Sequence, residues 1–266
     1  LVDNFCASLA SIVGAGGISA IYYSNRIIQF PMGIFSIALA SAVLPTLSGL
    51  VQKKDVESIK KTLVFSLENI FFIMCPTIVV LVLFAEPVVR VLFERGEFGA
   101  YSTNITSWTL MFYAFGLFSF GGIKIMVTAF HALQDTKTPV IVAAICLVLN
   151  GVLNFVLMFP LKIGGIALAS SIAGTIDFLI LFAIMEKKIG SFNSKLFLYF
   201  LRVTFASVLM GLLVYTLWIN IDISETVKVF AIGGAGFIIY GLIAIVFQIE
   251  QAQKIAGWIE KLLFKR

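Results

Sequence analysis

Long apolar runs constrain this chain more than any other feature. They cover residues 1–13, 18–48, 60–84, 103–130, 138–159, 165–186, 196–219 and 227–248. A helix needs about 20 such residues to cross a bilayer. Charged residues make up 12% of the chain, against about 25% in soluble domains, and the period-two alternation of a transmembrane barrel is missing. The sequence therefore predicts an all-α polytopic membrane protein with about eight transmembrane helices.

The first run starts at Leu1 and carries neither a basic segment nor a cleavage site. We therefore expect no signal peptide. The run instead predicts a helix that continues from a longer protein.

The basic residues predict the topology. Of the nineteen Lys and Arg residues, thirteen lie in or beside one set of connections and in the C-terminal tail. Four lie in or beside the other set, which includes the turn at residues 14–17 and the loop at 85–102. Because basic residues favour the cytoplasmic side, we expect the lysine-rich connections and the C-terminus to be cytoplasmic.

The run at residues 18–48 carries Arg26 and, five residues later, a Pro-x-Gly interruption at residues 31–33. An arginine that faces lipid costs roughly 3 kcal/mol or more, and Pro and Gly are tolerated at depth where neighbours or a cavity satisfy the freed carbonyls. Tyr22 and Gln29 lie within about one turn of the arginine. The pattern predicts that Arg26 faces an internal cavity, where its guanidinium group could bind phosphate.

Four other charged residues fall in apolar runs: Asp3, Glu68, Lys124 and Asp177. A structural salt bridge from Arg26 to Asp3 or Asp177 is the alternative to phosphate binding. Lys124 has two interpretations, because its ammonium group could reach an interior space or extend to the membrane interface.

Asn150 and Asn154 are spaced i and i+4 and share one helix face. Ser170 follows in the next run, and Asp3 could add a charge. Carboxylate, amide and hydroxyl oxygens are ligands for a hard monovalent cation. Hydrogen bonding between helices in lipid is the alternative.

The sequence offers little support for enzymatic chemistry. The single histidine, His131, falls in a polar turn at residues 131–139, and the three cysteines lie in apolar runs without metal-ligand spacing. Paired carboxylates, a Ser-His-Asp set, HExxH and a P-loop are all missing. The net charge of +5 follows the membrane topology, so we expect no nucleic-acid partner.

Two polar segments predict helices at the membrane surface. QKKDVESIKK at residues 52–61 is amphipathic and predicts a short interfacial helix. The tail at residues 250–266 predicts a basic amphipathic helix on the inner leaflet, with a solvated helix as the alternative. Its apolar face would hold Ile255, Trp258, Ile259, Leu262 and Leu263.

Four stretches share their pattern with one known family. They are YYSNRIIQFPMGIFSIALASAVLPTLS (22–48), LFERGEF (92–98), KIMVTAFHALQDTKTPV (124–140) and FPLKIGGIALASSIAG (159–174). They resemble the MurJ/MviN family of lipid II flippases, within the multidrug/oligosaccharidyl-lipid/polysaccharide exporter superfamily. The resemblance implies a fourteen-helix fold of two six-helix lobes and two additional helices. This chain would then supply the C-terminal lobe (1–190), the two additional helices (191–249) and a cytoplasmic tail (250–266).

The resemblance also implies roles for single residues. The family binds the diphosphate-sugar head group of lipid II in a cationic cavity and moves it outward by alternating access. Arg26 matches the cavity arginine of this lobe, and Lys124 matches a basic position before the DxKTP turn. Gln29 stands where some members carry Glu. The last two helices are implied to line a groove for the polyprenyl tail.

Some members bind sodium between helices seven, eleven and twelve. Asp3, Asn150, Asn154 and Ser170 fall near those positions, and Asn154 stands where an acid is expected. The resemblance thus implies sodium as a coupling or structural ion, and we expect no other cofactor.

We therefore expect part of a transporter, and not an enzyme, that flips lipid II across the bacterial cytoplasmic membrane. Its substrate-binding residues would be Arg26, Lys124, Tyr22 and Gln29, and its partner would be the N-terminal lobe of the same protein. Two alternatives stay open. One is an exporter of another polyprenyl-linked saccharide or of drugs, and the other is a non-transporting membrane scaffold.

Overall fold

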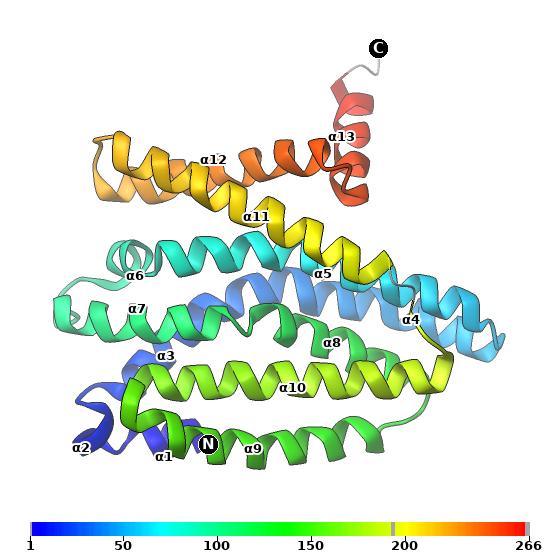
Figure 1. Cartoon of the computed structure of the whole chain (residues 1–266), viewed down its shortest axis with the longest axis horizontal. Coiled ribbons are helices and arrows are strands. Elements are labelled where there is room, and N and C mark those ends of the chain that lie inside the picture. Colours follow the sequence, from blue (N-terminus) through cyan, green and yellow to red (C-terminus); the bar gives the residue numbers. More distant parts are fainter. Residues whose placement is uncertain (1, 193–194, 264–266) are drawn as a thin grey trace.

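The computed structural model describes residues 2–192 and 195–263, in which helices are the only regular structure (Figure 1). Helices α7 (Ala100–Ala114) and α8 (Leu117–Ala132) form a pair with a bend of 49° between them. Together they are apolar enough to form one candidate span with a break in it. Six further helices are long and apolar enough to cross a membrane: Gly17–Gln52, Val56–Leu83, Lys137–Leu161, Ile163–Ile189, Leu196–Asn220 and Glu225–Val246. The expected all-α membrane fold is confirmed, with six or seven candidate spans in the described residues.

The first apolar run is divided into two short helices, α1 (Val2–Ala7) and α2 (Ala10–Val13). The hydroxyl group of Ser8 donates to the carbonyl oxygen of Phe5 at 2.6 Å. A serine that bonds its own backbone in this way competes with the helical ladder. The break after α1 holds Asp3 on a short, separately oriented helix.

The second run is one helix of 36 residues that changes type in its middle. Helix α3 (Gly17–Pro31) passes into a π-helical segment, η1 (Met32–Ile37), and then into α4 (Ala38–Gln52). Proline has no N–H group, so the regular hydrogen-bond ladder loses one bond at Pro31. The expected interruption is therefore a local widening of the helix, of the kind that often lies at functional sites.

The segment at residues 52–61 does not form a helix of its own, so that prediction is wrong. Helix α5 (Val56–Leu83) begins inside it, and the carboxylate of Asp55 accepts a hydrogen bond from the Ser58 amide at 3.0 Å. This N-cap satisfies one of the free amides of the first turn, and bonding to Ser58 lowers the pKa of Asp55. A short helix, α6 (Ala85–Phe93), follows in a connection where none was expected.

The polar turn before α9 (Lys137–Leu161) is held by Asp135. Its carboxylate accepts hydrogen bonds from the amide of Thr138 at 3.0 Å and from the hydroxyl of Thr138 at 2.6 Å. Lys188, near the end of α10 (Ile163–Ile189), reaches the same carboxylate at 2.7 Å. These contacts, led by Lys188, hold the pKa of Asp135 well below its usual range.

Helices α9 and α10 form a tight antiparallel pair (Figure 1). Gly165 makes this possible, because a Cβ atom there would lie 2.0 Å from the carbonyl oxygen of Leu157. Any larger residue would push the two helices apart at the turn that brings Ser170 toward α9.

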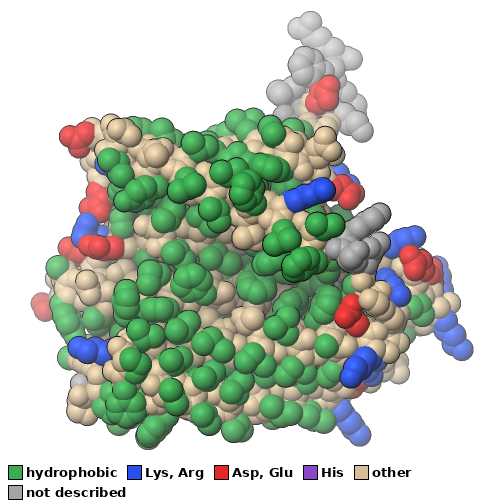
Figure 2. Space-filling model, in the orientation of Figure 1, with side chains coloured by type: hydrophobic (Ala, Val, Ile, Leu, Met, Phe, Trp, Pro, Cys, Tyr) green, Lys and Arg blue, Asp and Glu red, His purple; other side chains and the backbone are tan. Residues whose placement is uncertain are grey.

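The main core lies where α5, α8 and α10 meet, and it includes the fully buried Leu67, Ile70, Ile125 and Met126. Helix α3 packs on α7, whereas α11 (Lys195–Asn220) packs mainly on α5 and α12 (Glu225–Val246). In the view of Figure 2, hydrophobic side chains cover the middle of the molecule and charged side chains gather at its two ends. This pattern fits a molecule with its middle in a bilayer.

Helix α13 (Glu250–Leu263) stands at a steep angle to α12 (Figure 1). It contacts α5 through Gln251, whose amide nitrogen donates to Glu68 at 3.1 Å. Ile255 and Trp258 are 50% and 64% exposed, as an interfacial helix requires. The side chains of Ile259, Leu262 and Leu263, and residues 264–266, lie outside the described part. Membrane attachment of the tail stays a prediction.

Candidate functional site

The four residues expected to form a cation site come together. Asp3 lies on α1, Asn150 and Asn154 lie one turn apart on α9, and Ser170 lies on α10. The amide nitrogen of Asn154 donates to one carboxylate oxygen of Asp3 at 2.7 Å, and the Ser170 hydroxyl donates to the other at 2.8 Å. We call Asp3, Asn150, Asn154 and Ser170 the polar cluster.

Asn150 closes the cluster into a ring. Its amide nitrogen contacts the Ser170 hydroxyl at 3.0 Å, and its oxygen accepts from Asn154 at 3.2 Å. If the Asn150 amide is turned over, its nitrogen donates to Asp3 at 3.1 Å and its oxygen accepts from Ser170. Asn150 joins the network in either orientation.

Two oxygen atoms beside the cluster lack a partner. Asn154 is fully buried, yet its side-chain oxygen accepts no hydrogen bond from the described residues. The hydroxyl group of Tyr113, on α7, is likewise buried and unbonded, and it lies near Asp3, Ser170 and Asn25. An unsatisfied buried oxygen is costly, and a small cation or a water molecule would satisfy these two.

The donor set fits a hard cation and does not fit a transition metal. It offers one carboxylate with amide and hydroxyl oxygens, which suit oxygen-seeking ions. Within residues 2–192 and 195–263, no three His, Cys, Asp or Glu side chains gather as metal ligands. The three cysteines are free and buried, and His131 is exposed, as the sequence predicts.

Arg26 lies on an exposed face of α3, together with Tyr22 and Gln29. Its Nη2 atom donates to the Tyr22 hydroxyl at 3.0 Å, and its guanidinium carbon lies 4.9 Å from the centre of the same ring. Tyr22 thus holds the guanidinium on this face. We call Tyr22, Arg26 and Gln29 the arginine row.

The structural alternative for Arg26 is wrong. Among the described residues no salt bridge joins it to Asp3 or Asp177, and Asp3 is committed to Asn154 and Ser170. Most donors of the Arg26 guanidinium therefore have no partner among the described residues.

Lys124 does not join the arginine row. It lies exposed on α8, whereas Arg26 lies on α3. The structure thus brings the four predicted cation ligands into one site and leaves the predicted substrate residues on two helices.

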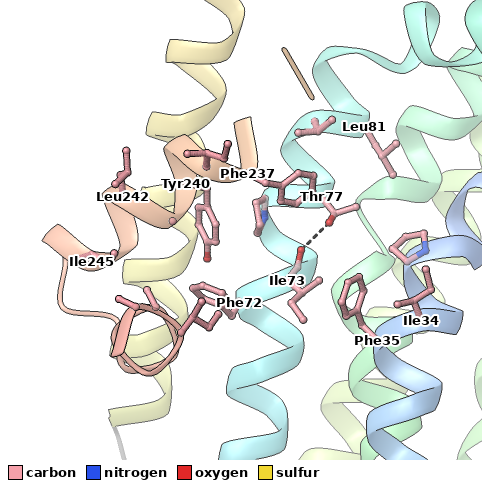
Figure 3. A pocket seen from close by; sticks show the side chains of 18 of the residues that line it. Ile34, Phe35, Phe72, Ile73, Thr77, Leu81, Phe237, Tyr240, Leu242 and Ile245 are labelled. Carbon is pink, nitrogen blue, oxygen red and sulfur yellow. Dashed lines mark hydrogen bonds between the residues drawn. The ribbon is translucent and has the colours of Figure 1, made fainter. Parts of the chain in front are cut away.

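Figure 3 shows a large apolar cavity. It measures about 1000 Å³ and lies between α3, η1, α5, α12 and α13. Ile27 and Phe30 contribute to it from α3, beside Arg26. Across the cavity, the ring of Phe72 on α5 packs on Tyr240 of α12 at 5.1 Å between centroids.

The wall of this cavity is almost entirely apolar. The hydroxyl group of Thr77 donates to the carbonyl of Ile73 at 2.7 Å (Figure 3), so it is already satisfied. Among the lining residues, α12 supplies the side chains of Phe237, Leu242 and Ile245, and the described residues of α11 supply none. The family resemblance implied a groove along the last two helices, and of these two only α12 contributes to the wall of this cavity among the described residues.

Comparison with known proteins gives the family of the chain. The family described as "Lipid II flippase MurJ" matches residues 1–232. A protein named probable lipid II flippase MurJ from Haemophilus influenzae is 33% identical over 214 residues, which cover 78% of this chain and 42% of the relative. One of the same name from Vibrio cholerae is 35% identical over 182 residues, covering 68% and 34%.

A solved structure of lipid II flippase MurJ, in an inward closed conformation, superposes with a TM-score of 0.76 at 26% identity. The match covers 96% of this chain and 52% of the solved one. The chain spans less than half the length of the two curated relatives. It belongs to the MurJ family of lipid II flippases.

Proposed function

We propose that the chain is part of a lipid II flippase and that the arginine row contacts the diphosphate of the substrate. The observation that carries this proposal is the exposed guanidinium of Arg26, which among the described residues is held by Tyr22 alone and lies beside a cavity of about 1000 Å³. A polyprenyl-diphosphate lipid has the matching chemistry, because its head group is anionic and its tail is apolar. Arginine binds such phosphates through two parallel hydrogen bonds.

The two halves of the site differ in what they would bind. The arginine row would hold the diphosphate, and Gln29 adds an amide that can bond a phosphate or sugar oxygen. The apolar cavity would take part of the polyprenyl chain, at roughly 25 cal/mol for each Å² of apolar surface removed from water. Lys124, on α8, would meet the head group at a second point during transport.

The full activity belongs to the longer protein. The chain would act as the C-terminal lobe with two additional helices, and the N-terminal lobe of the same protein would close the cavity. Alternating access in the bacterial cytoplasmic membrane would carry lipid II from the inner to the outer leaflet. The lysine-rich connections would then face the cytoplasm.

Complementation tests the proposal. Cells depleted of their own flippase would receive the full-length protein, either wild type, Arg26→Ala or Arg26→Lys. We expect rescue by the wild type, none by Arg26→Ala, and weak rescue by Arg26→Lys, which keeps the charge but loses the planar fork. Equal rescue by all three would remove Arg26 from substrate binding, and equal rescue by a protein truncated before residue 250 would argue against a tail-binding scaffold.

We also propose that the polar cluster binds a monovalent cation, with sodium as the family's ion. Asp3 would supply the charge, and the unbonded oxygens of Asn154 and Tyr113 would complete the shell. Binding to the folded state raises the unfolding temperature by mass action. Sodium chloride should therefore raise the unfolding temperature of the wild type above its value in choline chloride, and Asp3→Asn should abolish the difference. A difference that persists in Asp3→Asn would locate the ion elsewhere.

A further inference from the structure

A second cavity lies on the other side of α5. It measures about 450 Å³ and is bounded by α5, α8, α10 and the start of α11. It shares no lining residue with the larger cavity, because Phe71 faces this one and its neighbour Phe72 faces the other. A volume in this range is typical of a ligand site.

Phenylalanine rings form most of its wall. Phe71 packs on Phe200 at 5.1 Å and on Phe118 at 6.0 Å between ring centroids, and Phe118 and Phe178 are 6.2 Å apart. Each pair meets edge to face, the arrangement that aromatic rings prefer. The wall is therefore held by its own ring contacts before any ligand arrives.

The far end of the cavity is fixed by the turn between α10 and α11. The carboxylate of Glu186 accepts a hydrogen bond from the Phe192 amide at 2.8 Å and faces the Ser191 hydroxyl at 3.4 Å. This bond holds the Phe192 ring against Phe182, at 4.8 Å between centroids. Glu186, the acidic group among the described residues of the wall, is thus engaged by the turn and is not a free cation ligand.

The remaining polar group of the wall is also satisfied. The Thr175 hydroxyl donates to the Ser171 carbonyl at 2.8 Å and lies 3.0 Å from the hydroxyl of Ser119. The wall therefore offers a ligand mainly carbon surface, and only an apolar group fits it without leaving a polar atom unpaired.

The mouth of the cavity opens at the membrane-spanning surface. Leu179 on α10 and Phe197 on α11 are lining residues, and they are 55% and 66% exposed. Both belong to helices long and apolar enough to cross a bilayer. The molecules that can enter from that side are lipids.

Lysines gather at the same end of α10. Lys187 is exposed in its last turn, and the Nζ atom of Lys60 lies 2.8 Å from the position of a Cβ atom on Gly190. This is the end that the positive-inside rule assigns to the cytoplasm. Basic groups at such a boundary attract anionic lipid head groups.

We propose that this second cavity is a binding site for an anionic phospholipid of the inner leaflet. One acyl chain fills the phenylalanine-lined pocket, and the head group lies at Lys187 and Lys60. Helix α11 packs mainly on α5 and α12 and much less on α10. The acyl chain therefore lies between α10 and α11. The site is separate from the arginine row, and its occupancy does not depend on lipid II transport.

Photo-crosslinking tests the site. Full-length protein in lipid nanodiscs would receive phosphatidylglycerol carrying a photoreactive acyl chain, and labelled peptides would be located by mass spectrometry. We expect label on residues 175–182 and 196–200. Leu179→Trp should block the mouth and lower that label about tenfold, whereas Leu198→Trp, at an exposed position outside the lining, should leave it unchanged. Absence of label from these segments, or an equal loss in both variants, would overturn the proposal.

The head-group preference has its own test. Lys187→Gln should lower the labelling by phosphatidylglycerol about fivefold relative to the matching phosphatidylcholine probe, and Lys162→Gln, at the opposite end of α10, should not. Equal labelling of the wild type by the two probes would refute the anionic preference. Complementation would be unaffected by these outcomes, so a failure here is distinguishable from a failure of the flippase proposal.

Discussion

The polar cluster and the arginine row are two ways of keeping polar groups in apolar helices. In the cluster, Asp3 is engaged by Asn154 and Ser170 from two other helices. In the row, Arg26 has as its one partner in the described part of the chain Tyr22, one turn before it on the same helix. The cluster ties three helices together, whereas the row leaves a charge available. In our proposal the first arrangement serves stability as well as ion binding, and the second contacts the substrate.

The largest effect on folding should follow from breaking the cluster. Asp3→Ala leaves the donors of Asn154 and Ser170 without their acceptor, and each buried unsatisfied group costs about 1–3 kcal/mol. We expect a loss of about 2–3 kcal/mol in the free energy of unfolding, measured by denaturant titration of the purified protein. Asn4→Ala changes the exposed neighbour on α1 and serves as the control.

Denaturant titration of Arg26→Ala tests whether the arginine row differs from the polar cluster in its contribution to stability. An exposed residue with one local contact should change the free energy of unfolding by at most about 0.5 kcal/mol. A loss as large as that of Asp3→Ala would mean that the arginine row is structural, and the distinction between the two regions would fail.

A loss of stability no larger than that of Asp3→Ala is expected where η1 packs on α8. A Cβ atom on Gly121 of α8 would lie 2.8 Å from both Ile70 and the Ser36 hydroxyl of η1. Gly121→Ala should therefore destabilise the protein by about 1–3 kcal/mol through overpacking. Gly33→Ala is the matched control, because nothing lies within 4 Å of its Cβ position. Equal effects would show that η1 does not pack closely on α8.

The smallest effect on stability is expected at the Asp135 turn, where the ion pair between Asp135 and Lys188 is partly exposed. The pKa of Asp135 is lowered in the folded state, chiefly by Lys188. Its contribution to stability is therefore present above the unfolded pKa of about 3.9, and it is lost as the pH falls through the lower folded value. Lys188→Gln should make the amides of residues 136–138 exchange faster above about pH 4, where the Asp135 carboxylate is charged, whereas Lys187→Gln should not.

Regular patterns of the sequence predicted the shared features of the fold. Runs of about 20 apolar residues located the spans, and the i, i+4 spacing of Asn150 and Asn154 put both amides on the face that meets Asp3 and Ser170. In each case a local spacing fixes the geometry, so no knowledge of distant contacts is required.

Features that depend on contacts between distant segments were missed. Tyr113 lies in an apolar stretch of α7, and only the packing of α7 on α10 brings its hydroxyl near Asp3. The proline at residue 31 predicted an interruption, yet neighbouring helices allow a π-helical continuation. The sequence likewise could not exclude a salt bridge between Arg26 and Asp3. Both residues lie near the start of the chain, and no sequence pattern shows which way either side chain points.

Direct binding of substrate tests the central claim. Lipid II would be titrated into purified full-length wild type, Arg26→Ala and Arg26→Lys, with thermophoresis as the readout. We expect a dissociation constant at least about tenfold higher for Arg26→Ala, because one charge-assisted bidentate contact is lost, and an intermediate value for Arg26→Lys. Equal affinities for all three proteins, with unfolding unchanged, would contradict it.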